Sequence, residues 1–200
     1  MRTARWIVAI GIFNLVLVYL VLVRGQTHLH DKGNLIENIQ AMCYAIAIPM
    51  LVFLSYRTSG IIPWLSGIFA LTCLSILLRE IHMEDMQVPE LIKLLGSGTE
   101  RNLILGGSYL FLFSLFFFLY GFPCAQLLKL LKSEIAAMVI AGVICYLIAS
   151  IFDHMKIYFW EEILEMNGSL LILWAAIKFF QSPESLTRYT DETIVRRKRT

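Results

Sequence analysis

Six long apolar segments, separated by short polar stretches, dominate the chain. A transmembrane helix needs about 20 mostly apolar residues to cross a hydrocarbon core of about 30 Å. Lipid offers no hydrogen-bond partner to backbone N–H and C=O groups, so segments of this kind must be helical. The pattern therefore predicts an all-α fold, a polytopic bundle of six transmembrane helices. The expected spans are Trp6–Val23, Leu35–Tyr56, Ile61–Leu78, Leu103–Phe122, Ile135–Phe152 and Ile163–Phe180.

The composition also indicates a membrane protein, because 58% of the residues are hydrophobic and the mean hydropathy is +0.71. Soluble domains contain about 45–50% apolar residues. We expect one transmembrane domain over residues 1–182 and a basic cytoplasmic tail over residues 183–200. The basic residues form short clusters between spans rather than one stripe, so membrane lipids are expected partners and nucleic acid is not.

Lysine and arginine gather on one side of the predicted bundle. Arg2, Arg5, Arg57, Lys129 and Lys132 all fall on the side that also holds the basic tail. By the positive-inside rule this side is cytoplasmic, which places both termini inside. The opposite, outer side also carries some basic residues, so the bias is clear but incomplete. A bias of this kind, with compact loops, favours a bacterial inner membrane.

The outer side collects all four histidines and most of the carboxylates of the chain. Between the third and fourth spans, Pro89 is placed as at the start of a helix, and an apolar face follows. This predicts a short interfacial helix on the outer side of the bundle. Each outer connection also pairs an acid with a histidine. The pairs are His30 with Asp31, Glu80 with His82, and Asp153 with His154.

The stretch Asp153–Gly168 contains four carboxylates and a histidine next to apolar spans. Charged groups beside a membrane span are costly, so such groups indicate a functional site. Glu162, Glu165 and Ser169 are three and four residues apart, so they share one helix face. Acids in a first turn are also favoured by the helix macrodipole, which is the structural alternative for Glu161 and Glu162. Glu165 lies too deep for that explanation. We predict Glu165 and Glu162 as catalytic residues and Glu161 as a neighbour in the polar cluster.

Two further spans carry polar faces toward the same outer end. Glu37, Gln40 and Tyr44 share one face of the second span, and Glu37 is expected in the polar cluster. Arg79 lies in a polar stripe at the end of the third span. An arginine beside a membrane needs a carboxylate or a lipid phosphate, because it stays charged. We predict that Arg79 either pairs with an acid of the cluster or holds an anionic head group during catalysis.

Four residues are candidate metal ligands: His82, Asp153, His154 and Glu80. Mixed histidine and carboxylate ligands suit a divalent zinc, iron or manganese ion. The spacing matches no metal motif such as HExxH, and paired acids could equally bind calcium. Haem is not expected, because His82 and His154 lie at span ends rather than facing each other inside the bundle.

The sequence leaves three functions open. The first is a metal-dependent enzyme, a hydrolase of a lipid or lipid-linked envelope substrate, with Glu165 as general base and Arg79 on a head-group phosphate. The second is a non-enzymatic accessory or assembly subunit that binds a partner protein through small residues of the fifth span. The third is a cation- or proton-coupled transporter, which the lack of charge in the central third of each span disfavours. The small residues are Ala137, Ala141, Cys145 and Ala149.

Overall fold

The computed structural model describes residues 2–26, 35–80, 98–120 and 124–182, and the regular structure in these residues is helical. The all-α class predicted from the sequence is confirmed. The elements are α1 (Arg2–Val18), the π-helical turn η1 (Tyr19–Val23), α2 (Leu35–Arg57), α3 (Ile62–Glu80), α5 (Gly98–Tyr120), α6 (Cys124–Leu131), α7 (Glu134–His154) and α8 (Tyr158–Gln181).

Four of the described helices are long and apolar enough to cross a membrane. They are α2, the Asn102–Tyr120 part of α5, α7 and α8. Two shorter apolar helices, Val8–Val23 and Ile62–Leu78, cover the first and third predicted segments. The chain is therefore an integral membrane protein, and each predicted apolar segment overlaps one of these helices over most of its length. Residues 121–122 of the fourth segment lie outside the described residues.

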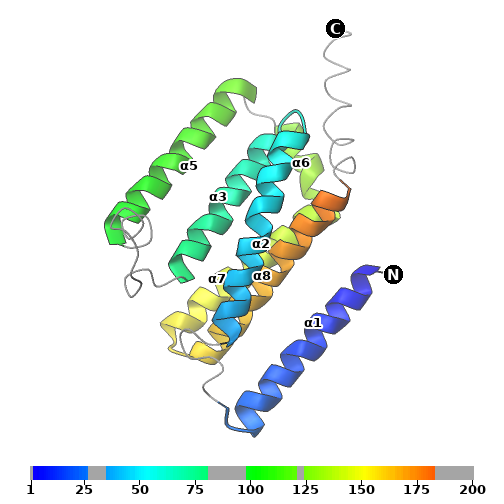
Figure 1. The fold of residues 1–200 in the computed structure, drawn as a ribbon, viewed down its shortest axis with the longest axis vertical. Coiled ribbons are helices and arrows are strands. Elements are labelled where there is room, and N and C mark those ends of the chain that lie inside the picture. Colours follow the sequence, from blue (N-terminus) through cyan, green and yellow to red (C-terminus); the bar gives the residue numbers. More distant parts are fainter. Residues whose placement is uncertain (1, 27–34, 81–97, 121–123, 183–200) are drawn as a thin grey trace.

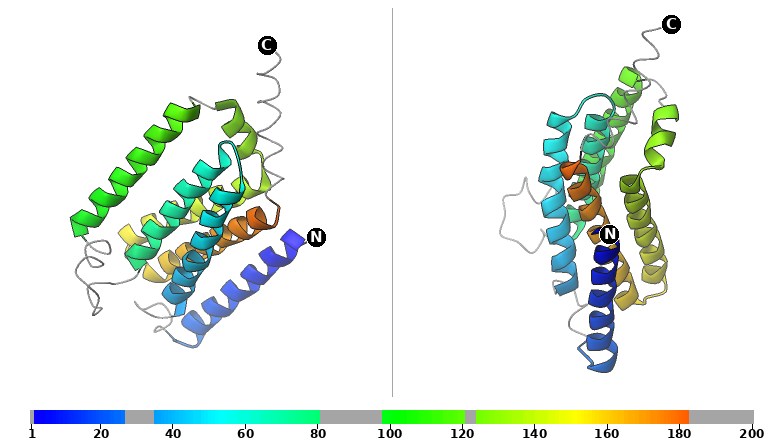
Figure 2. Two further views of the ribbon diagram at one scale, coloured as in Figure 1. Left: turned by 45° about the horizontal axis from the view of Figure 1, so that its top comes forward. Right: turned by 90° about the vertical axis from the view of Figure 1, so that its right-hand side faces the viewer.

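The body of the molecule consists of α2, α3, α7 and α8 (Figure 1). α7 packs along α8, α8 packs against α2, and α2 packs against α3. α1 and α5 lie on opposite flanks of this body, as Figures 1 and 2 show. The long helices alternate in direction, so α2 and α8 begin at the end of the bundle where α3 and α7 finish. We call this end the site end and the other the far end.

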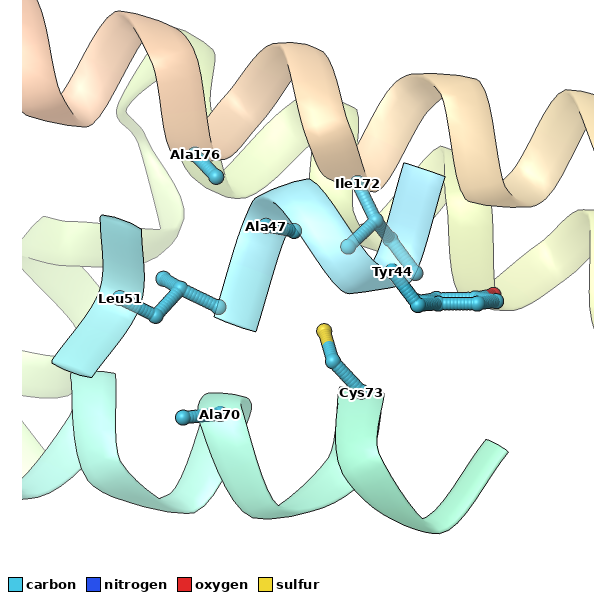
Figure 3. Close-up of a cluster of buried hydrophobic side chains, with 7 residues drawn as sticks. All are labelled: Tyr44, Ala47, Leu51, Ala70, Cys73, Ile172 and Ala176. Atoms are coloured by element: carbon cyan, nitrogen blue, oxygen red, sulfur yellow. The ribbon is translucent and has the colours of Figure 1, made fainter. Parts of the chain in front are cut away.

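The middle of the core lies where α2 is enclosed between α3 and α8 (Figure 3). The α2 residues in this core are three and four positions apart, so they form one helix face. Small side chains on the two neighbouring helices let the backbones approach closely. The core residues are Tyr44, Ala47 and Leu51 of α2, Ala70 and Cys73 of α3, and Ile172 and Ala176 of α8.

α8 begins at Tyr158, five residues before the predicted start of the sixth span. Its first turn carries Glu161, which lowers the hydropathy of this stretch and so hides the helix start from a hydropathy pattern. A carboxylate is nevertheless favourable at a helix N-terminus. Three residues separate α7 from α8, and among them Lys156 adopts a positive φ of 56°. Because of the early start, Glu165 is the eighth residue of α8. It lies about two turns inside the helix, deeper than a span that begins at Ile163 would place it.

A short helix, α6, lies between α5 and α7, where the sequence analysis placed only a connection between spans. Ser133 then caps α7, and its Oγ accepts a hydrogen bond from the backbone N–H of Ala136 at 3.1 Å. The interfacial helix predicted near Pro89 falls in residues 81–97, outside the described residues. That prediction stays untested.

Candidate functional site

The centre of the candidate site is a hydrogen bond between the side chains of Gln40 in α2 and Glu165 in α8. Gln40 Nε2 donates to Glu165 Oε2 at 3.0 Å. Glu165 is 7% exposed and Gln40 is fully buried, so both polar groups have left the solvent. A buried carboxylate is costly unless hydrogen bonds compensate for its lost hydration. The amide of Gln40 supplies part of this compensation across the α2–α8 interface.

Two tyrosines extend this pair into a chain of polar groups that joins α2, α7 and α8. Gln40 Nε2 also lies 3.4 Å from the hydroxyl of Tyr146 in α7. The Tyr146 hydroxyl in turn forms a hydrogen bond with the hydroxyl of Tyr44, one turn after Gln40 in α2. The chain leads from Glu165 toward the middle of the bundle, because Tyr44 also belongs to the α2–α3–α8 core.

The remaining oxygen of Gln40 is an open acceptor. Gln40 Oε1 is buried and receives no hydrogen bond from any residue that the structure describes. The amide has to point its NH₂ group toward the carboxylate, because an amide oxygen facing Glu165 would repel it. A donor such as a substrate hydroxyl or a water proton would therefore complete the site, since an unpaired buried acceptor costs about 1–3 kcal/mol.

Three further predicted carboxylates lie nearer the site end than the Gln40–Glu165 pair. Glu37 lies one turn before Gln40 in α2 and is buried, as the shared face of Glu37, Gln40 and Tyr44 predicts. Glu162 and Glu161 lie about one turn before Glu165 and are half-buried. All four acids therefore belong to the site end, with Glu165 the deepest on α8.

Two of the four predicted metal ligands lie at the surface of the site end. Asp153 and His154 are exposed in the last turn of α7, and His154 Nδ1 lies 2.9 Å from the carbonyl oxygen of Ser150. Tyr158, at the same end, begins α8, so Glu165 is seven residues farther along the bundle. At a rise of about 1.5 Å per residue this is about 10 Å. Asp153 and His154 are thus separated in depth from the buried carboxylate.

The side chains of the other two predicted ligands and of Arg79 lie outside the described part of the structure. His82 lies outside the described residues, as do the side chains of Glu80 and Arg79 at the end of α3. Within the described part of the chain, no three His, Cys, Asp or Glu side chains are placed to share a metal ion. The predicted four-ligand site is therefore neither assembled nor excluded.

The polar stripe of α3 turns toward α5. Thr72 accepts a hydrogen bond from the hydroxyl of Tyr109 in α5 at 3.0 Å. Arg79 is seven residues after Thr72, so its backbone lies on nearly the same helix face. This face differs from the one carrying Ala70 and Cys73, which contacts α2. The α3 stripe thus begins at the α3–α5 interface rather than at the Gln40–Glu165 centre.

A second polar link, between Asn14 in α1 and Asn167 in α8, was not anticipated. Asn14 Nδ2 donates to Asn167 Oδ1 at 2.8 Å, and Asn167 Nδ2 donates back to Asn14 Oδ1 at 3.3 Å. Asn167 Nδ2 also donates to the carbonyl oxygen of Ile163. An Asn inside an apolar segment is the sequence signal for such a link, because side-chain amides join membrane helices by hydrogen bonds.

The Asn14–Asn167 pair is expected to stabilise the docking of α1. Asn14→Leu and Asn167→Leu should each lower the free energy of unfolding, because each leaves the other amide without its partner. The double variant should lose less than the sum of the two. The expected coupling is about 0.5–2 kcal/mol, measured by a double-mutant cycle of unfolding in mixed micelles. Strictly additive losses would mean that the two amides do not interact.

The small residues of the fifth predicted span divide between two environments. Ala149 is buried, whereas Ala137 is exposed and Ala141 and Cys145 are half-buried. The close approach of α7 to α8 instead occurs at two glycines. A Cβ atom on Gly168 would lie 2.7 Å from the Tyr146 ring, and one on Gly142 would lie 3.1 Å from the Gly168 carbonyl oxygen. Gly168 therefore makes room for the ring that brings the Tyr146 hydroxyl to Gln40.

Comparisons of the chain with protein-family models, with characterised proteins and with solved structures found no match. The function is therefore inferred from the polar chain of Glu165, Gln40, Tyr146 and Tyr44 and from its setting in a membrane protein.

Proposed function

We propose that the chain crosses a bacterial inner membrane six times, with both termini in the cytoplasm and the site end at the periplasmic face. The alternating directions of the helices support this topology, because each apolar segment then returns the chain to the opposite face. Arg57 and Lys132 lie at the far end, on the side that the positive-inside rule assigns to the cytoplasm. The carboxylate-rich end then faces outward.

The site end is the centre of an enzyme that acts on a lipid or lipid-linked envelope substrate. The observation that carries this proposal is the buried Glu165 carboxylate, held by Gln40 beside the open acceptor Gln40 Oε1. Intramembrane carboxylates are rare and mark functional sites. A general base must reach the proton it removes within about 2.6–3.2 Å, and burial in a fixed network holds it in one position.

In this mechanism Glu165 removes a proton from a substrate hydroxyl or from an attacking water. Gln40 Oε1 accepts a hydrogen bond from the second proton of the attacking water, or from a neighbouring hydroxyl of the substrate, and so orients the reacting group. The paired hydroxyls of Tyr146 and Tyr44 stabilise the arrangement, because Gln40 Nε2 is shared between Glu165 and Tyr146. A substrate bearing hydroxyl groups on a lipid-anchored head would present them at this depth of the membrane.

We also propose a divalent metal ion at the surface of the site end. Asp153 and His154 would hold zinc, iron or manganese together with His82 and Glu80, and the metal would activate water or bind a phosphate. The depth of about 10 Å between this pair and Glu165 argues against one water shared by both. Glu162, nearer the start of α8, would be the better base for chemistry at such a metal, and Arg79 would hold a head-group phosphate.

The test is metal and product analysis of protein purified in mild detergent. Near-stoichiometric metal that is lost in Asp153→Asn/His154→Ala is expected, together with release of a water-soluble head group from extracted bacterial lipids, measured by mass spectrometry. Turnover without metal would remove the metal from the mechanism and keep Glu165. Folded protein with neither metal nor turnover would reject the enzyme and favour the second function.

That second function is an accessory subunit of a membrane complex. The exposure of Ala137 and the partial exposure of Ala141 and Cys145 favour it, because small residues on an outer helix face let a partner helix approach closely. A partner protein that copurifies with the wild type and is lost from Ala141→Leu would support this function.

A further inference from the structure

A cavity of about 380 Å³ lies toward the far end of the bundle, away from Glu165. α2, α3, α6, α7 and α8 all contribute to its wall, and nearly all of the lining side chains are apolar. On α8 the lining runs from Ile172 to Phe179, so it begins seven residues after Glu165. Ligand pockets commonly have volumes of about 300–1,000 Å³, so this one suits a small apolar ligand or a single chain of a larger one.

The hydroxyl of Ser66 is an unpaired polar group in this apolar wall. Ser66 is 1% exposed, and its Oγ forms no hydrogen bond with any described residue. Hydroxyls within other helices or directly after one, those of Thr72, Ser108 and Thr58, donate to the carbonyl four residues earlier. A buried hydroxyl without a partner is costly. A ligand with an acceptor oxygen among apolar groups would satisfy both the hydroxyl and the wall.

The depth of Ser66 indicates where that oxygen lies in a bilayer. Ser66 is the fifth residue of α3, so it lies about 6 Å along the helix from its far-end start. The cavity wall there is completed by Leu127, Leu130 and Leu131 of α6. A short helix that lines the cavity with leucines and is followed directly by an exposed lysine, Lys132, is typical of the boundary between head groups and acyl chains. Phospholipids carry their ester carbonyls at this boundary.

We propose that the cavity binds one acyl chain of an anionic phospholipid, whose ester carbonyl accepts a hydrogen bond from Ser66. The phosphate then lies beside Lys132, which directly precedes the α7 cap and is exposed. The far end faces the cytoplasmic leaflet in the proposed topology, where anionic lipids attract basic residues. The binding site itself is independent of the enzyme proposed at the site end, because it shares no residue with the Glu165 centre.

The experiment compares two leucine variants of adjacent alanines on α7. Ala136 lines the cavity, whereas Ala137 is exposed and does not. The full-length protein is titrated with phosphatidylglycerol in detergent, and bound lipid is counted by native mass spectrometry. We expect one tightly bound phosphatidylglycerol in the wild type and in Ala137→Leu. Ala136→Leu should weaken binding at least about tenfold, because the added side chain occupies the space of the acyl chain.

Two further variants test the oxygen and the phosphate. Ser66→Ala should weaken binding about 2- to 10-fold, as expected for the loss of one neutral hydrogen bond. Lys132→Gln should reduce the preference for phosphatidylglycerol over phosphatidylcholine. Equal affinity of Ala136→Leu and Ala137→Leu, or no retained lipid in the folded wild type, would overturn the acyl-chain site. Equal binding of the two lipids by the wild type would overturn the anionic head group.

Discussion

Glu165→Gln is expected to reduce turnover of the lipid substrate about 10²- to 10⁴-fold while leaving the protein folded. The loss of rate is that of a missing general base, since an amide cannot remove a proton. In the wild type, the hydrogen bond from Gln40 Nε2 to Glu165 joins α2 to α8 at 3.0 Å. The fold should persist in the variant because the new amide oxygen can still accept this hydrogen bond. Head-group release measures the first effect, and helicity and monodispersity in detergent measure the second.

The matched control is Glu161→Gln, on the same helix about one turn nearer the site end. Glu161 is half-buried, and its position in the first turn of α8 is explained by the helix macrodipole. Its replacement should change turnover only a few-fold. If Glu165→Gln instead unfolds the protein while Glu161→Gln does not, the buried carboxylate is a structural link between α2 and α8. Equal turnover in both variants would mean that Glu165 is not the base.

Gln40→Leu is expected to destabilise the protein more than Glu165→Gln does. It removes the donor and leaves the Glu165 carboxylate buried without this partner, which is costly for a charged group. Loss of stability should therefore exceed that of Glu165→Gln, although Gln40 itself carries no charge. A denaturation series on the two variants would separate the structural share of the Gln40–Glu165 hydrogen bond from the chemical share of the carboxylate.

The parts of the fold that follow from local pattern could be predicted from the sequence. Apolar segments must become helices because lipid leaves the backbone no other partner. The spacing of Glu37, Gln40 and Tyr44 fixes them on one face of α2, and all three are buried. The position of Glu165 inside its helix also follows from the sequence. However, α8 begins at Tyr158, earlier than hydropathy indicated, so Glu165 lies deeper in the helix than predicted.

The pairing of one helix with another does not follow from local pattern. Tyr146 lies in the most apolar of the spans, and nothing near it in sequence indicates that its hydroxyl meets Gln40 and Tyr44. The same holds for Asn14 and Asn167, which are 153 residues apart. These contacts depend on which helix faces come together. At the α7–α8 interface that choice depends on glycines, which carry no hydropathy signal.

Gly168→Ala is expected to destabilise the protein by about 1–3 kcal/mol and to disrupt the polar chain together with the packing. The new Cβ atom would lie 2.7 and 2.9 Å from two carbons of the Tyr146 ring and 3.0 Å from the carbonyl oxygen of Gly142. Neither neighbour can move away easily, because one is backbone and the other is a ring whose hydroxyl is held by Gln40 and Tyr44. Unfolding in mixed micelles and head-group release by the same sample measure the two effects.

Gly106→Ala in α5 is the control, because nothing lies within 4 Å of a Cβ atom at that position. It should leave stability unchanged or slightly raise it, since alanine favours the helix. A second variant, Tyr146→Ala, removes the ring and should destabilise the wild type. In the Gly168→Ala background it should cost much less, because the clash disappears with the ring, and the difference is a coupling between the two sites. If the two losses simply add, the ring of Tyr146 does not rest on Gly168. In that case a contact other than the one with Gly168 would hold the Tyr146 hydroxyl near Gln40.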